Sequence, residues 1–406
     1  MADRLKPLEN GGGASRAGAL RFVVLMGVVS LCADVTYQGA RGIIGPYFEF
    51  LGASAAIVGT VAGFGELIGY ALRLVSGYAT DRTRKYWAIA FVGYGVNLLA
   101  VPLMALAGRW EVVAALIILE RIGKAVRVPA RDAMLSHATK RIGHGWGFGL
   151  HKALDQIGAF TGPLIVALVL YLKKDAYRIG FAVLLIPALA ALAMLARGQR
   201  LYPDTRQFET KTVKLAGKGF PRAYWLYLAG AALIAAGYAD FPLIGFHMSK
   251  VKMVSTAWIP ISYAVSMAVA AGAALAFGRL FDRVGMASVI LMVALSAFFA
   301  PLSFSHSFSF AIVGIMLWGI GMGAQESVMR AVIATMVPAD KRGSAYGVFN
   351  TGFGVAWFLG SATMGKLYDV SIPALVAFSV AAQLAAIPLF FLAGKSQAVR
   401  TSHMSG

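Results

Sequence analysis

Charged side chains recur at helical spacing inside strongly apolar stretches of this chain, and they are the residues best able to do chemistry there. Within 111–138, four of them step by 4, 3 and 4 residues and therefore form one stripe along a helix: Glu120, Lys124, Arg127 and Arg131. Arg121 and Asp132 lie on an adjacent stripe. Such carboxylates can take up protons and such cations can bind anions, or the two kinds can pair with each other as a purely structural feature.

Other apolar stretches carry similar groups. Asp34, Gln38 and Arg41 share one helix face, and His151 and Asp155 are one turn apart. Histidine titrates near neutral pH, so the second pair could carry a proton, although such pairs are also common structural hydrogen bonds. The candidates for proton binding are the carboxylates Asp34, Glu66, Glu120 and Asp155. The candidates for lining a substrate cavity are Gln38, Arg41, Arg121, Lys124, Arg127, His151, Asp240, His247, Gln325, Glu326, Asn350 and Trp357.

Composition indicates what must hold these groups in place. Of 406 residues, 59% are hydrophobic and 14% are charged, and the mean hydropathy is +0.71, which excludes an ordinary soluble domain. The apolar residues come in stretches of roughly 20, the length that crosses about 30 Å of hydrocarbon as a helix. We expect transmembrane helices at 21–47, 55–78, 87–107, 111–138, 147–172, 176–196, 223–247, 257–278, 286–304, 309–336, 345–368 and 372–394.

The longest polar stretch divides these spans into two groups of six. The expected fold is therefore an all-α integral membrane protein, with twelve transmembrane helices in two six-helix pseudo-repeats around a central cavity. The expected organisation is a disordered cytoplasmic tail at 1–20, a bundle at 21–196, a cytoplasmic loop at 197–222, a second bundle at 223–394 and a cytoplasmic tail at 395–406.

The net charge of +19 comes mostly from Lys and Arg in the segments on one side of the expected membrane. The loops on the other side carry few basic residues: Arg109, Lys173, Lys174, Lys250 and Lys252. By the positive-inside rule, both termini are cytoplasmic and the protein is a multi-pass protein of the plasma (inner) membrane. Because orientation explains the basic excess, no nucleic-acid partner is needed. The single cysteine, Cys32, excludes an internal disulfide and a multi-cysteine metal site.

Two short motifs repeat between the halves. GYATDR at 77–82 follows the second span and GRLFDRVG at 278–285 follows the eighth, and their Gly and Asp–Arg positions are offset by 201. Gly162 and Gly360 belong to a second echo, offset by 198. Asp34 and Asp240 suggest a third echo, offset by 206. Parallel six-helix repeats with a site at the midplane are a known transporter plan.

The two Gly-x-x-x-Asp-Arg loops resemble the signature of the major facilitator superfamily of secondary transporters. The resemblance covers roughly residues 20–395, although Arg84 stands where the family has Gly in the first copy. We expect these loops, at the cytoplasmic face, to hold the halves together in one state rather than to bind substrate. The inner end of 111–138, from Arg127 to Asp132, either lines the substrate path or forms structural ion pairs with the Asp81 loop. The implied gating residues are Gly77, Asp81, Arg82, Arg131, Asp132, Gly278, Asp282 and Arg283.

Two further segments resemble parts of this superfamily. GAFTGP at 158–163 is similar to a motif of antiporter members, and its Gly158, Gly162 and Pro163 are expected to allow close helix packing and a bend. ERIGKAVRVPARD at 120–132 is similar to a segment of a bacterial, exporter-like subset.

The leading hypothesis is proton-coupled export of a small organic molecule by alternating access, with an anionic or zwitterionic substrate favoured by the basic stripe. The alternatives are a proton-coupled importer of an organic anion and a non-transporting membrane receptor on the same fold. An enzyme is not expected, because the sequence has no HExxH, phosphate-binding loop or GxSxG motif. We expect no cofactor, no metal and a monomer.

Overall fold

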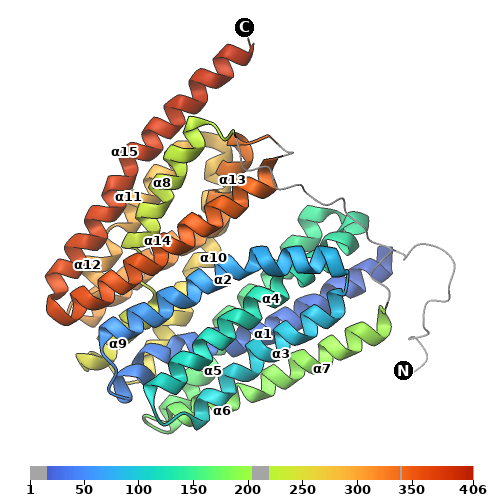
Figure 1. Cartoon of the computed structure of the whole chain (residues 1–406). Helices are drawn as coiled ribbons and strands as arrows, with labels where there is room; N and C mark the ends of the chain where they lie inside the picture. The colour runs from blue at the N-terminus through green and yellow to red at the C-terminus, as the bar shows by residue number, and fades with distance from the viewer. Residues whose placement is uncertain (1–15, 204–218, 339–340, 406) are drawn as a thin grey trace.

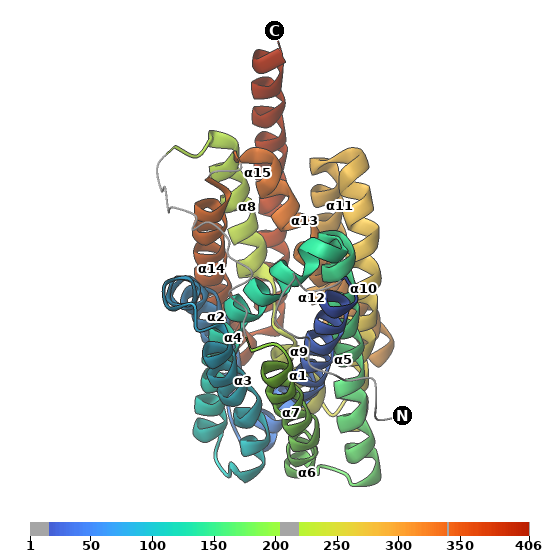
Figure 2. The same cartoon turned by 90° about the vertical axis from the view of Figure 1, so that its right-hand side faces the viewer.

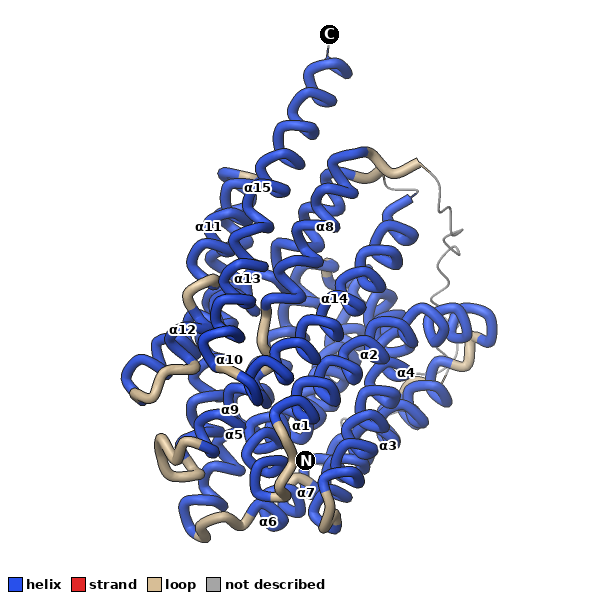
Figure 3. Tube along the Cα trace, turned by 60° about the vertical axis from the view of Figure 1, so that its left-hand side comes forward, coloured by secondary structure: helices blue, strands red, loops and turns tan. Residues whose placement is uncertain are grey.

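The computed structural model describes residues 16–203, 219–338 and 341–405, and the first part of the expected tail and most of the expected central loop lie outside this range. All regular structure among the described residues is helical (Figure 3). The first half contains α1 (Arg16–Phe50), α2 (Ala55–Thr83), α3 (Tyr86–Leu103), the short 3₁₀ helix η1 (Met104–Leu106), α4 (Trp110–Ile142), α5 (His144–Leu172), α6 (Tyr177–Val183) and α7 (Leu185–Leu201). The second half contains α8 (Arg222–Gly237), α9 (Phe241–Lys250), α10 (Trp258–Val284), α11 (Met286–Ser296), α12 (Phe299–Ser303), α13 (Phe308–Met336), α14 (Arg342–Val370) and α15 (Ile372–Ser405).

These helices form twelve membrane spans within the described residues, because α6 with α7, α8 with α9, and α11 with α12 each make one span in two pieces. Ten of the spans are long and apolar enough to cross a membrane by length and composition. The other two are α4, which carries the charged stripe, and α14. The all-α, twelve-helix prediction is confirmed.

Several expected boundaries move. α1 begins at Arg16, inside the expected tail, and α7 continues to Leu201, inside the expected central loop. α15 runs to Ser405, beyond the expected end at 394. These helices extend past the apolar stretches because backbone hydrogen bonding does not stop where the hydrocarbon stops.

Each half packs on itself and then on the other half. In the first half α1 lies along α5 and α3 along α4, whereas in the second half α10 lies along α13 and α8 along α15. The most extensive contacts between the halves are those of α2 with α14, α1 with α9, and α5 with α10. Figures 1 and 2 show the two bundles side by side, with α2 and α14 running along their boundary.

The halves meet most closely at the end that holds the turn 51–54, which we call the tight end. There the Asp369 carboxylate accepts hydrogen bonds from the backbone N–H groups of Ala55 (3.1 Å) and Ala56 (2.8 Å) at the start of α2. Ser249 Oγ donates to Glu49 of the other half at 3.0 Å. The opposite end, where α1 begins and the Asp–Arg loops lie, we call the basic end.

Glycines set the distance between α1 and α5. A Cβ on Gly158 would lie 2.9 Å from Asp34 Cβ, and a Cβ on Gly162 would overlap the Val35 carbonyl oxygen. The second half uses the same contact, since a Cβ on Gly360 would overlap the carbonyl oxygen of Ala236. Backbones this close require glycine, so the position of α5 against α1 is fixed at the level of Asp34.

The seventh span is broken between α8 and α9, at 238–240. The break leaves backbone carbonyls without helical partners, and side chains supply them: Trp318 Nε1 donates to Ala239 O at 2.8 Å and Ser379 Oγ donates to Gly237 O at 2.6 Å. Non-helical backbone at membrane depth is tolerated only when it is satisfied in this way. The break turns Asp240 toward the first half.

Candidate functional site

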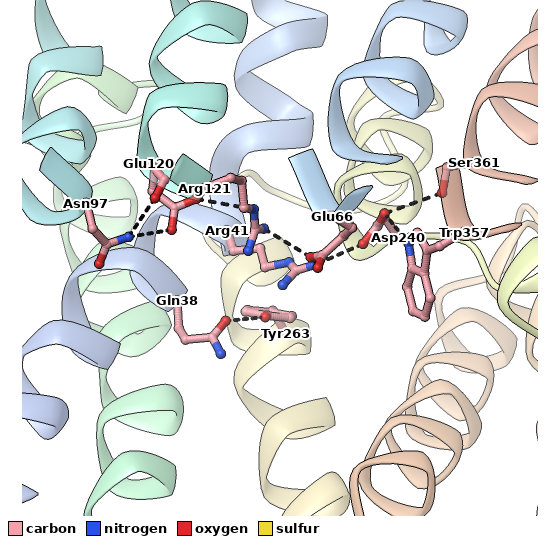
Figure 4. A network of polar contacts seen from close by, with 10 residues as sticks. All are labelled: Gln38, Arg41, Glu66, Asn97, Glu120, Arg121, Asp240, Tyr263, Trp357 and Ser361. Atoms are coloured by element: carbon pink, nitrogen blue, oxygen red, sulfur yellow. Dashed lines mark hydrogen bonds and ion pairs between the residues drawn. The ribbon is translucent and has the colours of Figure 1, made fainter. Parts of the chain in front are cut away.

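A network of charged side chains crosses from one half to the other at the centre of the molecule (Figure 4). We call it the central network, and it consists of Arg41, Glu66, Asn97, Glu120, Arg121, Asp240, Trp357 and Ser361. Its residues come from α1, α2, α3, α4, the α8–α9 break and α14. It thus brings together charged residues that the sequence placed in separate spans, on α1, α2 and α4.

Arg41 is the residue that joins the halves. Its Nη2 donates to Glu66 Oε1 at 2.9 Å and to Asp240 Oδ1 at 2.7 Å. Its side chain is 11% exposed and that of Asp240 is 1% exposed, so neither charge is well solvated and each depends on the other. Separation of the halves at this level must break the pair with Asp240.

The first-half side of the network holds its two glutamates in ion pairs. Arg121 lies 3.4 Å from Glu66 and 3.2 Å from Glu120. Asn97 Nδ2 donates to the Glu120 carboxylate at 2.8 Å and to its backbone oxygen at 3.0 Å. A carboxylate in contact with a guanidinium is stabilised in its charged form. Glu66 and Glu120 are therefore placed as ion-pair partners, one of the two roles that the sequence left open for them.

The second-half side of the network is built around Asp240. Its Oδ2 accepts from Trp357 Nε1 at 2.8 Å, with the Ser361 hydroxyl at 3.5 Å. Near this level a second polar contact crosses the halves, because the Tyr263 hydroxyl donates to Gln38 Oε1 at 2.6 Å. Trp357 continues into a ladder of rings with Phe353, 5.5 Å between centroids.

A second group of titratable side chains lies entirely within the first half, on α1, α3, α4 and α5. We call it the α5 cluster, and it consists of Ser30, Asp34, Tyr37, Tyr94, Lys124, Arg127, Arg131, His151 and Asp155. Lys124 Nζ lies 4.1 Å from the centre of the Tyr37 ring, and the Arg127 guanidinium lies 4.4 Å from that of Tyr94. The basic stripe of α4 thus meets aromatic faces as well as carboxylates.

Asp155 has a different environment from the glutamates. The contact recorded for its carboxylate within the cluster is His151 Nδ1, 3.7 Å from Oδ2, and its buried Oδ1 has no hydrogen-bond partner among the described residues. Asp34 faces it across the Gly158 contact. Both residues are at least nine-tenths buried. Among the residues that the structure describes, neither carboxylate forms an ion pair with a guanidinium.

The gating residues lie at the basic end but do not pair as expected. Asp81 and Arg82 are exposed, and the Arg131 guanidinium binds Asp132 at 2.9 Å. The expected pairing of Arg131 with the Asp81 loop is therefore wrong in this conformation, because a nearer carboxylate follows Arg131 in the same helix.

The first motif copy also differs from the second in its backbone. Arg84 ends α2 in the left-handed conformation, with φ 55° and ψ 18°. Gly285, at the matching position of the second copy, has φ 55° and ψ −129°, which glycine adopts far more readily than other residues. Of the other members of the motif, Gly278 has open space around it, while Asp282 and Arg283 are exposed.

The remaining predicted cavity residues are scattered. His247 follows Asp240, the N-cap of α9, by seven residues on the same helix, and it binds Tyr368 Oη at 2.9 Å and Ser305 O at 3.1 Å. Glu326 pairs with Lys152 of α5 at 3.2 Å, an exposed contact between the halves. Buried Gln325 and half-buried Asn350 lie on α13 and α14, away from the residues of the central network.

Sequence reasoning missed several polar residues that complete the two groups or bridge the halves elsewhere: Ser30, Tyr37, Tyr94, Asn97, Tyr263, Ser361 and Asp369. Most of them are neutral, and a lone hydroxyl or amide in an apolar stretch gives little signal. Asn97 was the most visible, because it is the only amide of α3 and lies within a strongly apolar span.

A small cavity lies against the central network, lined by Arg41, Arg121, Ile44, Phe48, Ile117 and Pro242 among others. Its volume of about 20 Å³ suits a single water molecule. The Nε atom of Arg41 is buried without a hydrogen-bond partner in the structure, and a water molecule here would satisfy it.

Comparison with known proteins agrees with this architecture. The sequence profile of the Major Facilitator Superfamily matches residues 26–361. The chain belongs to this superfamily. An uncharacterised protein of Mycobacterium tuberculosis is 42% identical over 387 residues, which cover 93% of this chain and 95% of the relative. An MFS-type transporter of Methanocaldococcus jannaschii is 24% identical over 357 residues, 86% of this chain and 89% of the relative.

The fold is also that of solved members of the superfamily. The nucleoside transporter NupG matches with a TM-score of 0.71 at 14% sequence identity, over 91% of this chain and all of the other. At this level of identity the match concerns the fold alone. Superfamily membership makes the chain a secondary transporter embedded in a membrane, with a small molecule as its substrate.

Proposed function

We propose that this Major Facilitator Superfamily member is a proton-coupled transporter that exports a small organic molecule by alternating access. One observation carries the proposal: Arg41 of the first half binds Asp240 of the second half, deep in the membrane region, in a network continuous with Glu66 and Arg121. A charged contact between two bundles is a tie that a substrate or a proton can weaken. When the contact between Arg41 and Asp240 is lost, the tight end can open.

We propose the α5 cluster as the site of proton coupling. Coupling requires a group whose proton affinity differs between the two access states. Glu66 and Glu120 are held by Arg41 and Arg121, so Asp155 and its neighbour Asp34 remain as the carboxylates best able to exchange a proton. We propose that the basic end, with its Asp–Arg loops, faces the cytoplasm. We also propose that the protein is a monomer in the plasma (inner) membrane.

An anionic or zwitterionic substrate suits the residues between the halves. Arg41, Arg121 and Lys124 offer positive charge, and the Trp357 and Phe353 rings offer an apolar surface. The cations are already balanced by carboxylates in this conformation, so an anionic group on the substrate would replace Asp240 or Glu66 as a partner of Arg41.

Transport by purified protein in lipid vesicles tests the proposal. Vesicles with an imposed pH gradient are loaded with a panel of anionic, zwitterionic and cationic compounds, and wild type is compared with Asp155→Asn and Glu120→Gln. We expect gradient-driven movement of a compound by wild type and Glu120→Gln, and movement without gradient coupling by Asp155→Asn. Movement that ignores the gradient in wild type refutes proton coupling. Movement of the compound in the same direction as the protons refutes export in favour of import.

A further inference from the structure

A chain of polar contacts leads from Asp155 to the basic end. Ser30 Oγ lies 2.9 Å from His151 Nε2, and Arg131 Nη1 lies 3.5 Å from Ser30 Oγ. Arg131 is in turn bound to Asp132 at 2.9 Å, and the Asp132 side chain is 48% exposed. Five residues on α5, α1 and α4 thus connect the buried Asp155 carboxylate with the Arg131–Asp132 ion pair near the surface.

Each contact in this chain has a donor and an acceptor. A guanidinium can only donate, so Arg131 donates to the Ser30 oxygen. The Ser30 hydroxyl can still donate to His151 Nε2 or accept from it. We assign Ser30 as the donor, because the Asp155 carboxylate beside Nδ1 favours a proton on that ring nitrogen. A neutral imidazole that accepts at Nε2 carries its proton on Nδ1. That N–H faces Asp155 Oδ2 across 3.7 Å, a separation that a small movement closes to a hydrogen bond.

The order of contacts lets the basic end act on Asp155. When Arg131 and Ser30 are in place, the imidazole presents a donor to the carboxylate and stabilises its charged form. When the Arg131–Asp132 pair is rearranged, Ser30 is released, and the imidazole can turn its lone pair toward Asp155 instead. The same carboxylate then binds a proton more readily.

We propose that Ser30 and His151 are positioning residues that transmit the state of the Arg131–Asp132 pair at the basic end to the proton affinity of Asp155. The inference rests on the proposed function, because it gives a proton-coupled transporter a way to change the affinity of its proton site when access changes. Ser30 is fully buried and bonds to His151 across the α1–α5 contact, so it is held in one place by the glycine packing described above.

Other charged groups also act on this site. Asp34 of α1 and Lys152 of α5 lie near Asp155, and Arg127 and Lys124 reach the same region from α4. Lys152 is itself paired with Glu326 of α13. The Lys152–Glu326 pair joins the two halves, and Arg131 also interacts with Asp155 directly through its charge. The contribution of the Ser30–His151 contact is therefore the part of the effect of the Arg131–Asp132 pair that Ser30→Ala removes.

The proton affinity of Asp155 can be measured without a substrate. Purified protein in lipid is titrated by infrared difference spectroscopy, and the protonated-carboxyl band that Asp155→Asn removes is assigned to Asp155. We expect Ser30→Ala and His151→Phe to raise the midpoint of this band by roughly one pH unit, as expected for loss of one hydrogen bond to the carboxylate. Thr36→Val is the matched control, because it removes another buried α1 hydroxyl whose bond, to Cys32 O, is local.

His151→Gln separates positioning from proton transfer by the imidazole. Glutamine can still accept from Ser30 and donate to Asp155 but cannot titrate, so the midpoint should stay near that of wild type. A shift as large as that of His151→Phe overturns the positioning role.

The link to the basic end is tested with Asp132→Asn in two backgrounds. If the chain transmits the change, the midpoint shift that Asp132→Asn causes in wild type differs from the shift in Ser30→Ala. Equal shifts in both backgrounds overturn the inference while leaving proton coupling intact. If no carboxyl band disappears in Asp155→Asn, both the inference and the proposed role of Asp155 as the proton site are refuted.

Discussion

The pair between Arg41 and Asp240 should control how readily the tight end opens. In Asp240→Asn the amide oxygen can still accept from Trp357, but the charge that holds Arg41 is lost. A hydrogen bond to a charged group contributes about 1.5–3 kcal/mol, and breaking a buried ion pair costs about 3–5 kcal/mol. Arg41 keeps Glu66 as a partner at 2.9 Å, so we take the lower part of this range, roughly 2–3 kcal/mol.

A change of this size acts on a population. Each 1.4 kcal/mol is about a factor of ten, so the ratio of tight-end-open to tight-end-closed molecules should rise roughly 30- to 150-fold in Asp240→Asn. The matched comparison is Asn97→Asp or Glu120→Gln, because those changes disturb the network only on its first-half side. They should leave the ratio within a few-fold of wild type.

Spin labels across the tight end measure this ratio. Labels at Lys174 and Ser255, on the loops that follow α5 and precede α10, report the separation of the halves by double electron–electron resonance in a Cys32→Ala background. We expect a second, longer distance to grow in Asp240→Asn. If the distance distribution stays that of wild type while the variant remains folded, Arg41 and Asp240 do not hold the tight end closed and the reasoning fails.

Three further changes test individual contacts. Asp369→Asn should open the same labelled distance less than Asp240→Asn does, by about 0.5–1 kcal/mol and less at high salt, because this cap is exposed. Gly162→Ala should lower the unfolding midpoint in detergent by an amount equal to about 1–3 kcal/mol, whereas Gly149→Ala on the same helix, with open space around it, should not. Gly285→Ala should destabilise by about 1–3 kcal/mol because of its backbone angles, and Gly278→Ala should be neutral or slightly stabilising; equal effects in either glycine pair would contradict the packing or backbone argument.

The sequence predicted the positions of the helices better than it predicted which side chains contact each other. Apolar length and helical spacing were enough to place twelve spans and to predict charged faces on α1 and α4. They could not tell which stripe faces which, because that depends on how the helices pack. Glu66 forms an ion pair with Arg121, which is one of the two roles open to a carboxylate in such a span. The partner of Arg41 in the second half, Asp240, was not predicted.

The proposed echo of Asp34 and Asp240 shows the same limit. Gly162 contacts Val35 and Gly360 contacts Ala236, so the packing register relates the first and seventh spans by 201 positions rather than 206. In this register Asp34 corresponds to Ala235, and the third echo is wrong as a structural equivalence. The break at 238–240 places Asp240 where no regular helix would, and its only signal was Pro242 soon after a polar residue.

The way in which the α8–α9 break is satisfied has a consequence for how the molecule can move. The orphaned carbonyls of the break are capped by Trp318 and Ser379, and the Tyr238 hydroxyl returns a bond to the Trp318 carbonyl. All of these partners belong to the second half. When the halves separate, no main-chain group of the break has to be exposed to lipid or water; at the break, only the Asp240 side chain changes partners. The second half can therefore move as a rigid body. Asp240 can face either Arg41 or solvent while the backbone of the break keeps its conformation.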